Sequence, residues 1–490
     1  MSLREKTILA VKWNLLSTIV SVMLGIILLW ALSHILSVEQ YGIISASLII
    51  SNFFLMLLDF GISNSIVRQK SISPIELSSL STINILMGLI AFVTCFFMSS
   101  YISELFKGNQ DLVLQIKILS VSFLFVSFGL QSKALLTKEM SFSILSRIVI
   151  ISSIINFVSS ISLALIFSQS WCVAVSFLLS TFVNSLLTRY YARHMLVFYF
   201  KFSLTSLSKH FKYGVQLVLD SIVNQVSINT YPVLMSRLIN LAAIGGYNIS
   251  YSISIALFEK LNPVLSHALF PAFSKIGSDA QRLNNSFLKA TCFSSMINFP
   301  MLLGMMLVSH NVVSVFFDEK WSFITPIVQI LCIVGAIRSL DTPVISILLV
   351  KAQMYRNVNL GILKLLLGIP LTWWLGLNYG INGIVSAFLI IQVFNTFFGY
   401  FYLINPCTHI KFHEYFTSIT TPFLHVLPML ICGFVEEICL SKYQITDSYS
   451  LIIKIISCCI VYILTILYSN NLLIKEFREI AFENFLKKVK

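Results

Sequence analysis

The chain has 490 residues, of which 57% are hydrophobic and only 11% are charged, and its mean hydropathy is +0.88. A soluble protein of this length could not bury so much apolar surface. The composition therefore excludes a soluble protein and indicates a membrane protein. A net charge of +13 could also indicate nucleic-acid binding, but the positions of the lysines and arginines along the chain indicate that the charge reflects membrane topology.

A membrane-spanning helix needs about 20 mostly apolar residues. The sequence contains fourteen such runs, and no small-residue cleavage site follows the first, so we predict fourteen spans and no removed signal peptide. In chain order, the predicted spans are 13–36, 41–62, 81–103, 112–133, 144–167, 170–192, 213–236, 241–260, 288–310, 322–350, 357–379, 381–405, 417–438 and 449–468.

The lysines and arginines predict the orientation of these spans. With the N terminus on the inner side, 25 of the 33 fall in inner segments and only four fall in outer segments. Such a bias marks the cytoplasmic side of a membrane protein. It therefore predicts cytoplasmic N and C termini and an even number of spans, and it accounts for the basic net charge.

The longest predicted inner connection, about 193–212, falls near the centre of the first twelve spans. We therefore predict an N-terminal six-helix lobe at 1–200 and a C-terminal six-helix lobe at 201–405. Two additional helices and an amphipathic cytoplasmic tail are predicted for 406–490. The tail has apolar residues at helical spacing, which predicts a helix at the membrane surface. These residues are Leu473, Phe477, Ile480 and Ala481.

A faint internal repeat supports two related halves. The segment "LSHILSVEQYGIISAS" aligns with "MSRLINLAAIGGYNIS" at an offset of 203, which pairs Gly42 with Gly245. The segments that begin at Val175 and Val385 align at an offset of 210. Both offsets equal about six helices with their loops, and repeats of this kind usually flank a transport pathway.

Several segments resemble one family of exporters. They are "LSVEQYGIISASLIISNFFLMLLDFGISNSIVRQ", "MSRLINLAAIGGYNISYSI", "LNPVLSHALFPAFSKIGSDAQRL", "VVSVFFDEKW" and "GAIRSLDTPVISILLVKAQ". In this order and spacing they resemble polysaccharide flippases of the multidrug/oligosaccharidyl-lipid/polysaccharide (MOP) exporter superfamily, in its colanic-acid and O-antigen branch. The similarity covers about residues 1–405. Family members often have glycine in the segment where this chain has Ala352, and this departure weakens the case for a close backbone approach there.

The resemblance implies an all-α membrane protein with about 14 transmembrane helices. Two six-helix lobes in a MOP/MATE-like arrangement would surround a central cavity, with two C-terminal helices added. The implied function is a flippase, not an enzyme. It would move an undecaprenyl-pyrophosphate-linked oligosaccharide, an O-antigen or related repeat unit, across the bacterial inner membrane by alternating access.

The resemblance also implies partners. They are the lipid-linked oligosaccharide and membrane lipids, with a polysaccharide polymerase and a chain-length regulator as further candidates. No nucleic acid is expected as a partner. No cofactor is expected, because the sequence has no GxxxxGK[ST] nucleotide-binding stretch. The nine cysteines, His409 and His413 lack the spacing of a metal site. The expected coupling ion is H⁺ or Na⁺.

Arg338 and Asp341 interrupt an apolar run in "GAIRSLDTPV". Arg338 lies roughly a dozen residues from the inner end of its predicted span, about 18 Å deep at 1.5 Å per residue. A flippase needs cations in a wet cavity for a diphosphate, and an arginine fork suits that task. We predict that Arg338 and Asp341 line the cavity and that Pro343 opens the helix beside them. A structural ion pair between helices is the alternative.

Three further charged residues are candidates. Lys364, within the eleventh span, is predicted to add positive charge to the cavity, although a lysine can also extend to the membrane surface. Arg237 is predicted to line the pathway, with an anchor at a helix interface as the alternative. Asp220, close to Asn224 and Gln225, is predicted to couple transport to an ion, with a polar contact between helices as the alternative. Lys117 and Lys454 are expected to extend to the surface.

Two other functions stay open at this stage. A polysaccharide polymerase or ligase would need a sizeable outer loop with Arg or His, whereas the predicted outer loops are short. A multidrug antiporter of the same superfamily would favour an aromatic and acidic cavity, which Arg338 and Lys364 argue against.

Overall fold

The structure, a computed structural model, is helical throughout the part of the chain that it describes. The described residues are 3–59, 63, 66, 72–195, 222–256, 269, 273–274, 276, 279–443 and 446–478. The chain forms two compact units, Met1–Gly246 and Tyr247–Lys490. The lobe boundaries at 200 and 405 stay predictions.

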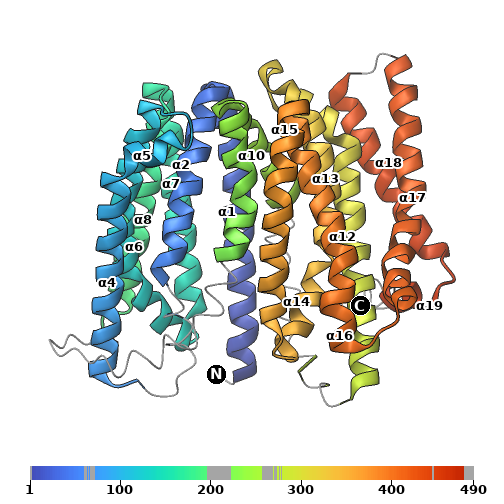
Figure 1. The fold of residues 1–490 in the computed structure, drawn as a ribbon, viewed down its shortest axis with the longest axis horizontal. Helices are drawn as coiled ribbons and strands as arrows, with labels where there is room; N and C mark the ends of the chain where they lie inside the picture. The colour runs from blue at the N-terminus through green and yellow to red at the C-terminus, as the bar shows by residue number, and fades with distance from the viewer. Residues whose placement is uncertain are drawn as a thin grey trace. The chain divides into compact units, whose positions relative to one another are not determined.

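The first unit is built around α6, which packs against α2, α4 and α8, while α1 packs against α7 (Figure 1). Small residues permit these close approaches: Gly88 faces Ser127, and Gly129 faces Ser185. The helices are α1 (Leu3–Ile35), α2 (Val38–Asp59), α4 (Pro74–Phe97), α5 (Ser99–Glu104), α6 (Gln110–Lys138), α7 (Phe142–Phe167), α8 (Trp171–Tyr191), the stretch 222–238 and α10 (Leu241–Tyr251), which crosses the boundary between the units.

Local sequence determines where several helices of this unit begin. The Ser73 hydroxyl accepts a hydrogen bond from the N–H of Glu76, and Pro74 occupies the first turn of α4, where an N–H is not needed. The Asn109 side chain caps α6 in the same way through the N–H groups of Asp111 and Leu112.

The second unit centres on α12, which packs against α13, α17 and α18. Its elements are η1 (Ser252–Ala256), α12 (Ala280–Phe316), η2 (Glu319–Ile324), α13 (Thr325–Arg338), α14 (Asp341–Val350), α15 (Met354–Gly399), η3 (Tyr400–Ile404), α16 (Asn405–Thr408), α17 (Phe412–Lys442), α18 (Asp447–Tyr468) and α19 (Leu472–Arg478). One large apolar core joins α12, α14, α15 and α17 around Phe287, Tyr400 and Tyr415.

The 46 residues of α15 form a hairpin of two helices. A straight helix of this length would be about 69 Å long, more than twice the thickness of a bilayer core. The chain reverses at Gly380, whose φ of 59° is readily adopted only by glycine. The two ends meet, since Arg356 donates a hydrogen bond of 3.0 Å to the Tyr402 carbonyl. The predicted spans 357–379 and 381–405 are therefore confirmed as separate helices.

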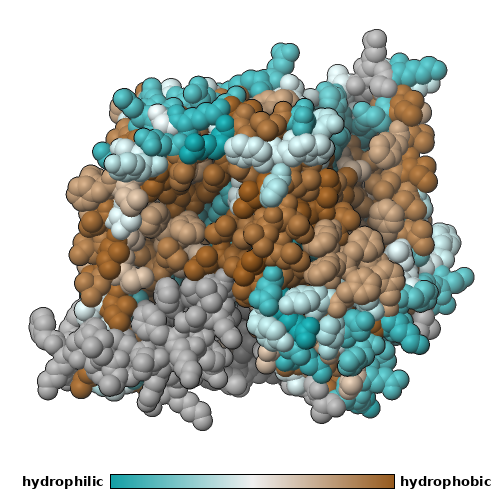
Figure 2. All heavy atoms as spheres, viewed as in Figure 1, coloured by the Kyte–Doolittle hydropathy of each residue, from teal (hydrophilic) through white to brown (hydrophobic). Residues whose placement is uncertain are grey.

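Eleven helices in the described part of the chain are long and apolar enough to cross a membrane, and the α15 hairpin counts once among them. Apolar side chains cover the middle of the helices on the face in view, and polar side chains gather at their ends (Figure 2). Exposed residues such as Ile90, Leu366 and Ile438 face lipid rather than core in such a protein. The full count of fourteen spans stays a prediction.

A candidate substrate-binding site in the second unit

The tenth predicted span breaks between Arg338 and Asp341. Helix α13 (Thr325–Arg338) ends at Arg338 and α14 begins at Asp341, with Ser339 and Leu340 between them. Pro343 lies in the first turn of α14, where the missing N–H has no cost. The predicted opening of the helix is confirmed, and it falls beside the two charged residues.

Asp341 lies within hydrogen-bonding distance of two amide side chains from the second helix of the α15 hairpin. Gln392 Nε2 donates to Asp341 Oδ2 at 3.3 Å, and Asn395 Nδ2 donates to Asp341 Oδ1 at 3.3 Å. Both amides are almost fully buried. Because a buried carboxylate needs such donors, these two bonds hold α14 against α15.

The charges of Lys364 and Arg338 both act on the Asp341 carboxylate. Lys364 belongs to the first helix of the α15 hairpin, so both helices of the hairpin contribute to this cluster. Arg338 also donates from Nη1 to the Tyr251 hydroxyl at 3.2 Å. The structure therefore brings together three of the predicted residues, Arg338, Asp341 and Lys364, in a cluster that we call the charged cluster, with Gln392 and Asn395.

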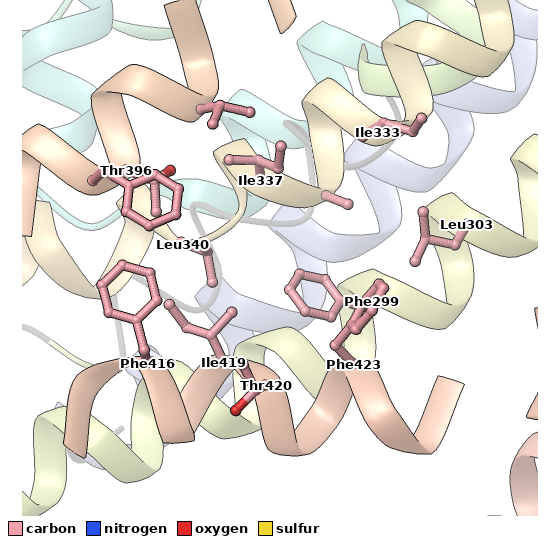
Figure 3. A pocket seen from close by; sticks show the side chains of 13 residues that line it. Phe299, Leu303, Ile333, Ile337, Leu340, Thr396, Phe416, Ile419, Thr420 and Phe423 are labelled. Atoms are coloured by element: carbon pink, nitrogen blue, oxygen red, sulfur yellow. The ribbon is translucent and has the colours of Figure 1, made fainter. Parts of the chain in front are cut away.

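An apolar cavity of about 270 Å³ lies between α12, α13, α15 and α17 (Figure 3). In Figure 3, side chains of α17 point toward Ile337 and Leu340 across the cavity. Thr396 and Thr420 are the only lining residues with a polar side chain among the described residues. The lining residues are Phe299, Leu303, Ile333, Ala336, Ile337, Leu340, Val393, Thr396, Phe397, Phe416, Ile419, Thr420 and Phe423.

The charged cluster and the apolar cavity are built on the same two segments. Leu340 lines the cavity and Asp341 follows it at the helix break, while Asn395 bonds Asp341 and Thr396 lines the cavity. Adjacent positions on a helix point in different directions, so each segment presents a polar side to one site and an apolar side to the other.

Arg237 belongs to the first unit, whereas the residues of the charged cluster belong to the second. Its Nε donates to the Leu105 carbonyl at 2.9 Å, and Lys107 Nζ donates to the Ile239 carbonyl at 2.6 Å. This reciprocal arrangement joins the end of α5 to the end of helix 222–238, as the interface alternative predicted. A pathway role for Arg237 stays a prediction. Asp220 lies outside the described residues.

The expectation that Lys454 extends to the membrane surface is wrong. Its side chain is only 1% exposed, and Nζ pairs with Glu437 and donates to Asn311 Oδ1 at 2.7 Å. A buried ammonium needs such partners, and the apolar run around it gave no sign that α12 and α17 supply them. Lys117 has its ammonium 5.5 Å from the centre of the Phe96 ring.

A family model described as "Polysaccharide biosynthesis protein" matches residues 31–326, more than half of the chain. The chain belongs to this family. Among curated relatives, the lipopolysaccharide biosynthesis protein WzxC of Escherichia coli (strain K12) is 34% identical over 89% of this chain and 88% of its own. A membrane protein encoded in the cps region of Klebsiella pneumoniae is 33% identical over 99% of this chain and 100% of its own.

Solved structures show the fold of this polysaccharide biosynthesis family member. The lipid II flippase MurJ, in an inward closed conformation, matches with a TM-score of 0.74 and 17% identity over 98% of this chain and 100% of its own. An inward-facing MATE family multidrug transporter of the MOP superfamily matches with a TM-score of 0.65 and 14% identity, over 79% of this chain and 93% of its own. At these identities the match establishes a shared fold.

Together these findings confirm the predicted polysaccharide biosynthesis family and the all-α membrane fold. Sequence reasoning missed Gln392, Asn395 and Tyr251 as parts of the site. The spacing of Gln392 and Asn395 was a usable signal, because two amides three residues apart share one face of an otherwise apolar helix.

Proposed function

We propose that this member of the polysaccharide biosynthesis family flips an undecaprenyl-pyrophosphate-linked oligosaccharide across the bacterial inner membrane by alternating access, with both termini cytoplasmic. The observation that carries the proposal is the placement of the charged cluster and the apolar cavity on the same two helical segments. The substrate has the same two parts, a polar head that cannot enter hydrocarbon and a chain that can.

In this proposal the charged cluster binds the head of the substrate. Arg338 presents a planar fork that matches phosphate oxygens, and Lys364 contributes a second cation. Asp341 keeps both cations oriented and balances their charge when no substrate is bound. Gln392 and Asn395 hold Asp341 in place and offer amide groups that suit sugar hydroxyls.

The apolar cavity receives part of the hydrocarbon chain. Its lining is aromatic and aliphatic apart from two threonines, so it suits a hydrocarbon chain better than a sugar or a phosphate. It adjoins the segments that carry the charged cluster, which allows one molecule to occupy both. A prenyl chain therefore fits the cavity, while the head group lies on the polar side of the same helices.

Transport against a gradient needs an energy source. We propose that H⁺ or Na⁺ supplies it, with Asp220 as the coupling carboxylate. A polysaccharide polymerase and a chain-length regulator are proposed as partners that use the translocated unit.

The test is complementation of a strain that lacks this transporter. Arg338→Ala should abolish surface polysaccharide while the protein still reaches the membrane, and Arg338→Lys should restore it only in part because a lysine lacks the fork. Arg282→Ala is the matched control, because the Arg282 side chain is 81% exposed and pairs only with nearby Asp279 among the contacts described. Normal polysaccharide with Arg338→Ala would refute the role of the charged cluster.

A further inference from the structure

The buried Lys454 is the centre of a polar network at one end of α17 and α18. Its Nζ donates to Asn311 Oδ1 on α12 and pairs with Glu437 on α17. The Asn311 Nδ2 in turn donates to Asp447 Oδ1 at 3.2 Å. The oxygen and nitrogen of one amide thus bind residues of α18 at two points, so the network fixes α18 on α12 and α17 on α18.

The network lies beside a helix that needs support. Two prolines, Pro422 and Pro428, lie inside α17, and each removes one backbone hydrogen bond of the helix. The α17 residues that line the cavity, from Phe416 to Phe423, run up to and past Pro422. The cavity wall is therefore the part of α17 that its own backbone holds least firmly.

The neighbouring helix α18 supports this part of α17. The Thr465 hydroxyl donates to the His425 carbonyl at 3.1 Å, between the two prolines, and the His425 Nε2 lies 3.0 Å from the Ser469 Oγ. Farther along, Ser457 donates to Glu436 at 2.7 Å. These contacts bind α17 to α18 over most of their shared length, where the two helices run side by side (Figure 1).

The other side of α18 contacts α12, which lines the cavity beside α17. The Tyr462 hydroxyl donates to the Met296 carbonyl at 2.5 Å. Beyond α18, Glu476 of α19 forms an ion pair of 2.7 Å with Lys289 of α12. Since α12 contributes Phe299 and Leu303 to the cavity and α18 packs on both α12 and α17, α18 braces the α17 wall against α12.

We propose that Lys454 is a positioning residue, which acts through α18 to hold the α17 wall of the apolar cavity in place for the hydrocarbon chain of the substrate. This inference rests on the proposed function. In this inference α17 forms one wall of the cavity and α18 braces that wall. A preorganised site binds its ligand more tightly because less order is lost on binding.

The experiment compares two ligands with the same head group, undecaprenyl pyrophosphate and isopentenyl pyrophosphate, whose chain is short. Their affinities for the purified full-length protein are measured from ligand-dependent shifts in Tm. Lys454→Met should weaken binding of undecaprenyl pyrophosphate by about tenfold or more and leave binding of isopentenyl pyrophosphate unchanged. Lys442→Met, at the exposed end of α17, is the control and should change neither affinity.

Glu437→Gln is the second variant. The Glu437 side chain is 46% exposed, so its neutralisation removes the ion pair and leaves the Lys454 bond to Asn311 in place. It should shift undecaprenyl affinity in the same direction as Lys454→Met, and it keeps the test valid if Lys454→Met does not fold.

Each outcome is informative. Unchanged affinity for undecaprenyl pyrophosphate, or a parallel loss for both ligands, would overturn the positioning role. If the unmodified protein binds neither ligand, the proposed function fails first and this inference fails with it. If the unmodified protein prefers the long chain and the variants keep that preference, the proposed function stands and the inference alone is wrong.

Discussion

Replacing Gly42 with alanine should strongly destabilise the first unit. A Cβ at this position would lie 2.0 Å from the carbonyl oxygen of Leu241 and 2.5 Å from the carbonyl carbon, which are backbone atoms of α10. Carbon and oxygen atoms normally stay more than 3 Å apart, so α10 would have to move about 1 Å away from α2.

The size of the effect follows from how little can adjust. Overpacking a well-packed interior typically costs about 1–3 kcal/mol and more where backbone must shift. The intrinsic helix preference for alanine offsets about 1 kcal/mol of this cost. We expect a net loss of about 2 kcal/mol or more, because the clash is with backbone rather than with a side chain that could rotate.

Gly25→Ala is the matched control. Gly25 also lies in a membrane helix, α1, but nothing lies within 4 Å of the Cβ that alanine would add there. Gly25→Ala should therefore raise stability slightly through helix preference alone. The assay is thermal unfolding of both variants in detergent, with membrane levels measured in parallel. If Gly42→Ala unfolds at the same temperature as Gly25→Ala, the close approach of α2 and α10 is refuted.

Three more predictions follow from contacts described above. Asp341→Asn should lower polysaccharide export about tenfold or more while the protein keeps normal membrane levels, because it removes the charge that Arg338 and Lys364 face and a charge-assisted contact is worth about 1.5–3 kcal/mol. Unchanged export would contradict this role of Asp341. Ala352→Gly should raise Tm, because Ala352 has a φ of 53° and a left-handed backbone costs alanine about 1–2 kcal/mol. This strain exceeds the entropy that glycine loses on folding, so a lower Tm would show that the strain is absent. Arg237→Ala should cost less than about 1 kcal/mol in thermal unfolding, because its bond to Leu105 is exposed to solvent; a large loss would point to a buried role.

Much of the fold was predictable because lipid imposes simple requirements. A span must be long and apolar, so the segments around residues 13–36 and 144–167 could be predicted from length and hydropathy alone. The separation of 357–379 from 381–405 was predictable for the same reason, since one straight helix would be too long. The break at Ser339 was predictable from Pro343, since it falls beside Arg338 and Asp341 as expected, although the helix ends before the proline and not at it.

The candidate site was predictable only where charge gave a signal. Arg338, Asp341 and Lys364 are conspicuous in apolar runs, and the structure brings them together. Partners from other helices gave weaker signals, since Tyr251 and Gln392 are ordinary residues until the fold places them. Lys454 shows the limit of hydropathy reasoning: a lysine near the end of a span either reaches the surface or meets Asn311 inside the protein, and only tertiary packing decides.

The internal repeat gains a physical meaning from the contact between α2 and α10. Gly42 and Gly245 are equivalent positions of the repeat, and a Cβ at Gly245 would lie 2.9 Å from the Gly42 nitrogen. Both residues must be small, because a side chain on either one would meet the backbone of the other helix. The sequence repeat therefore pairs two positions at which the structure makes the same demand, a residue without a side chain.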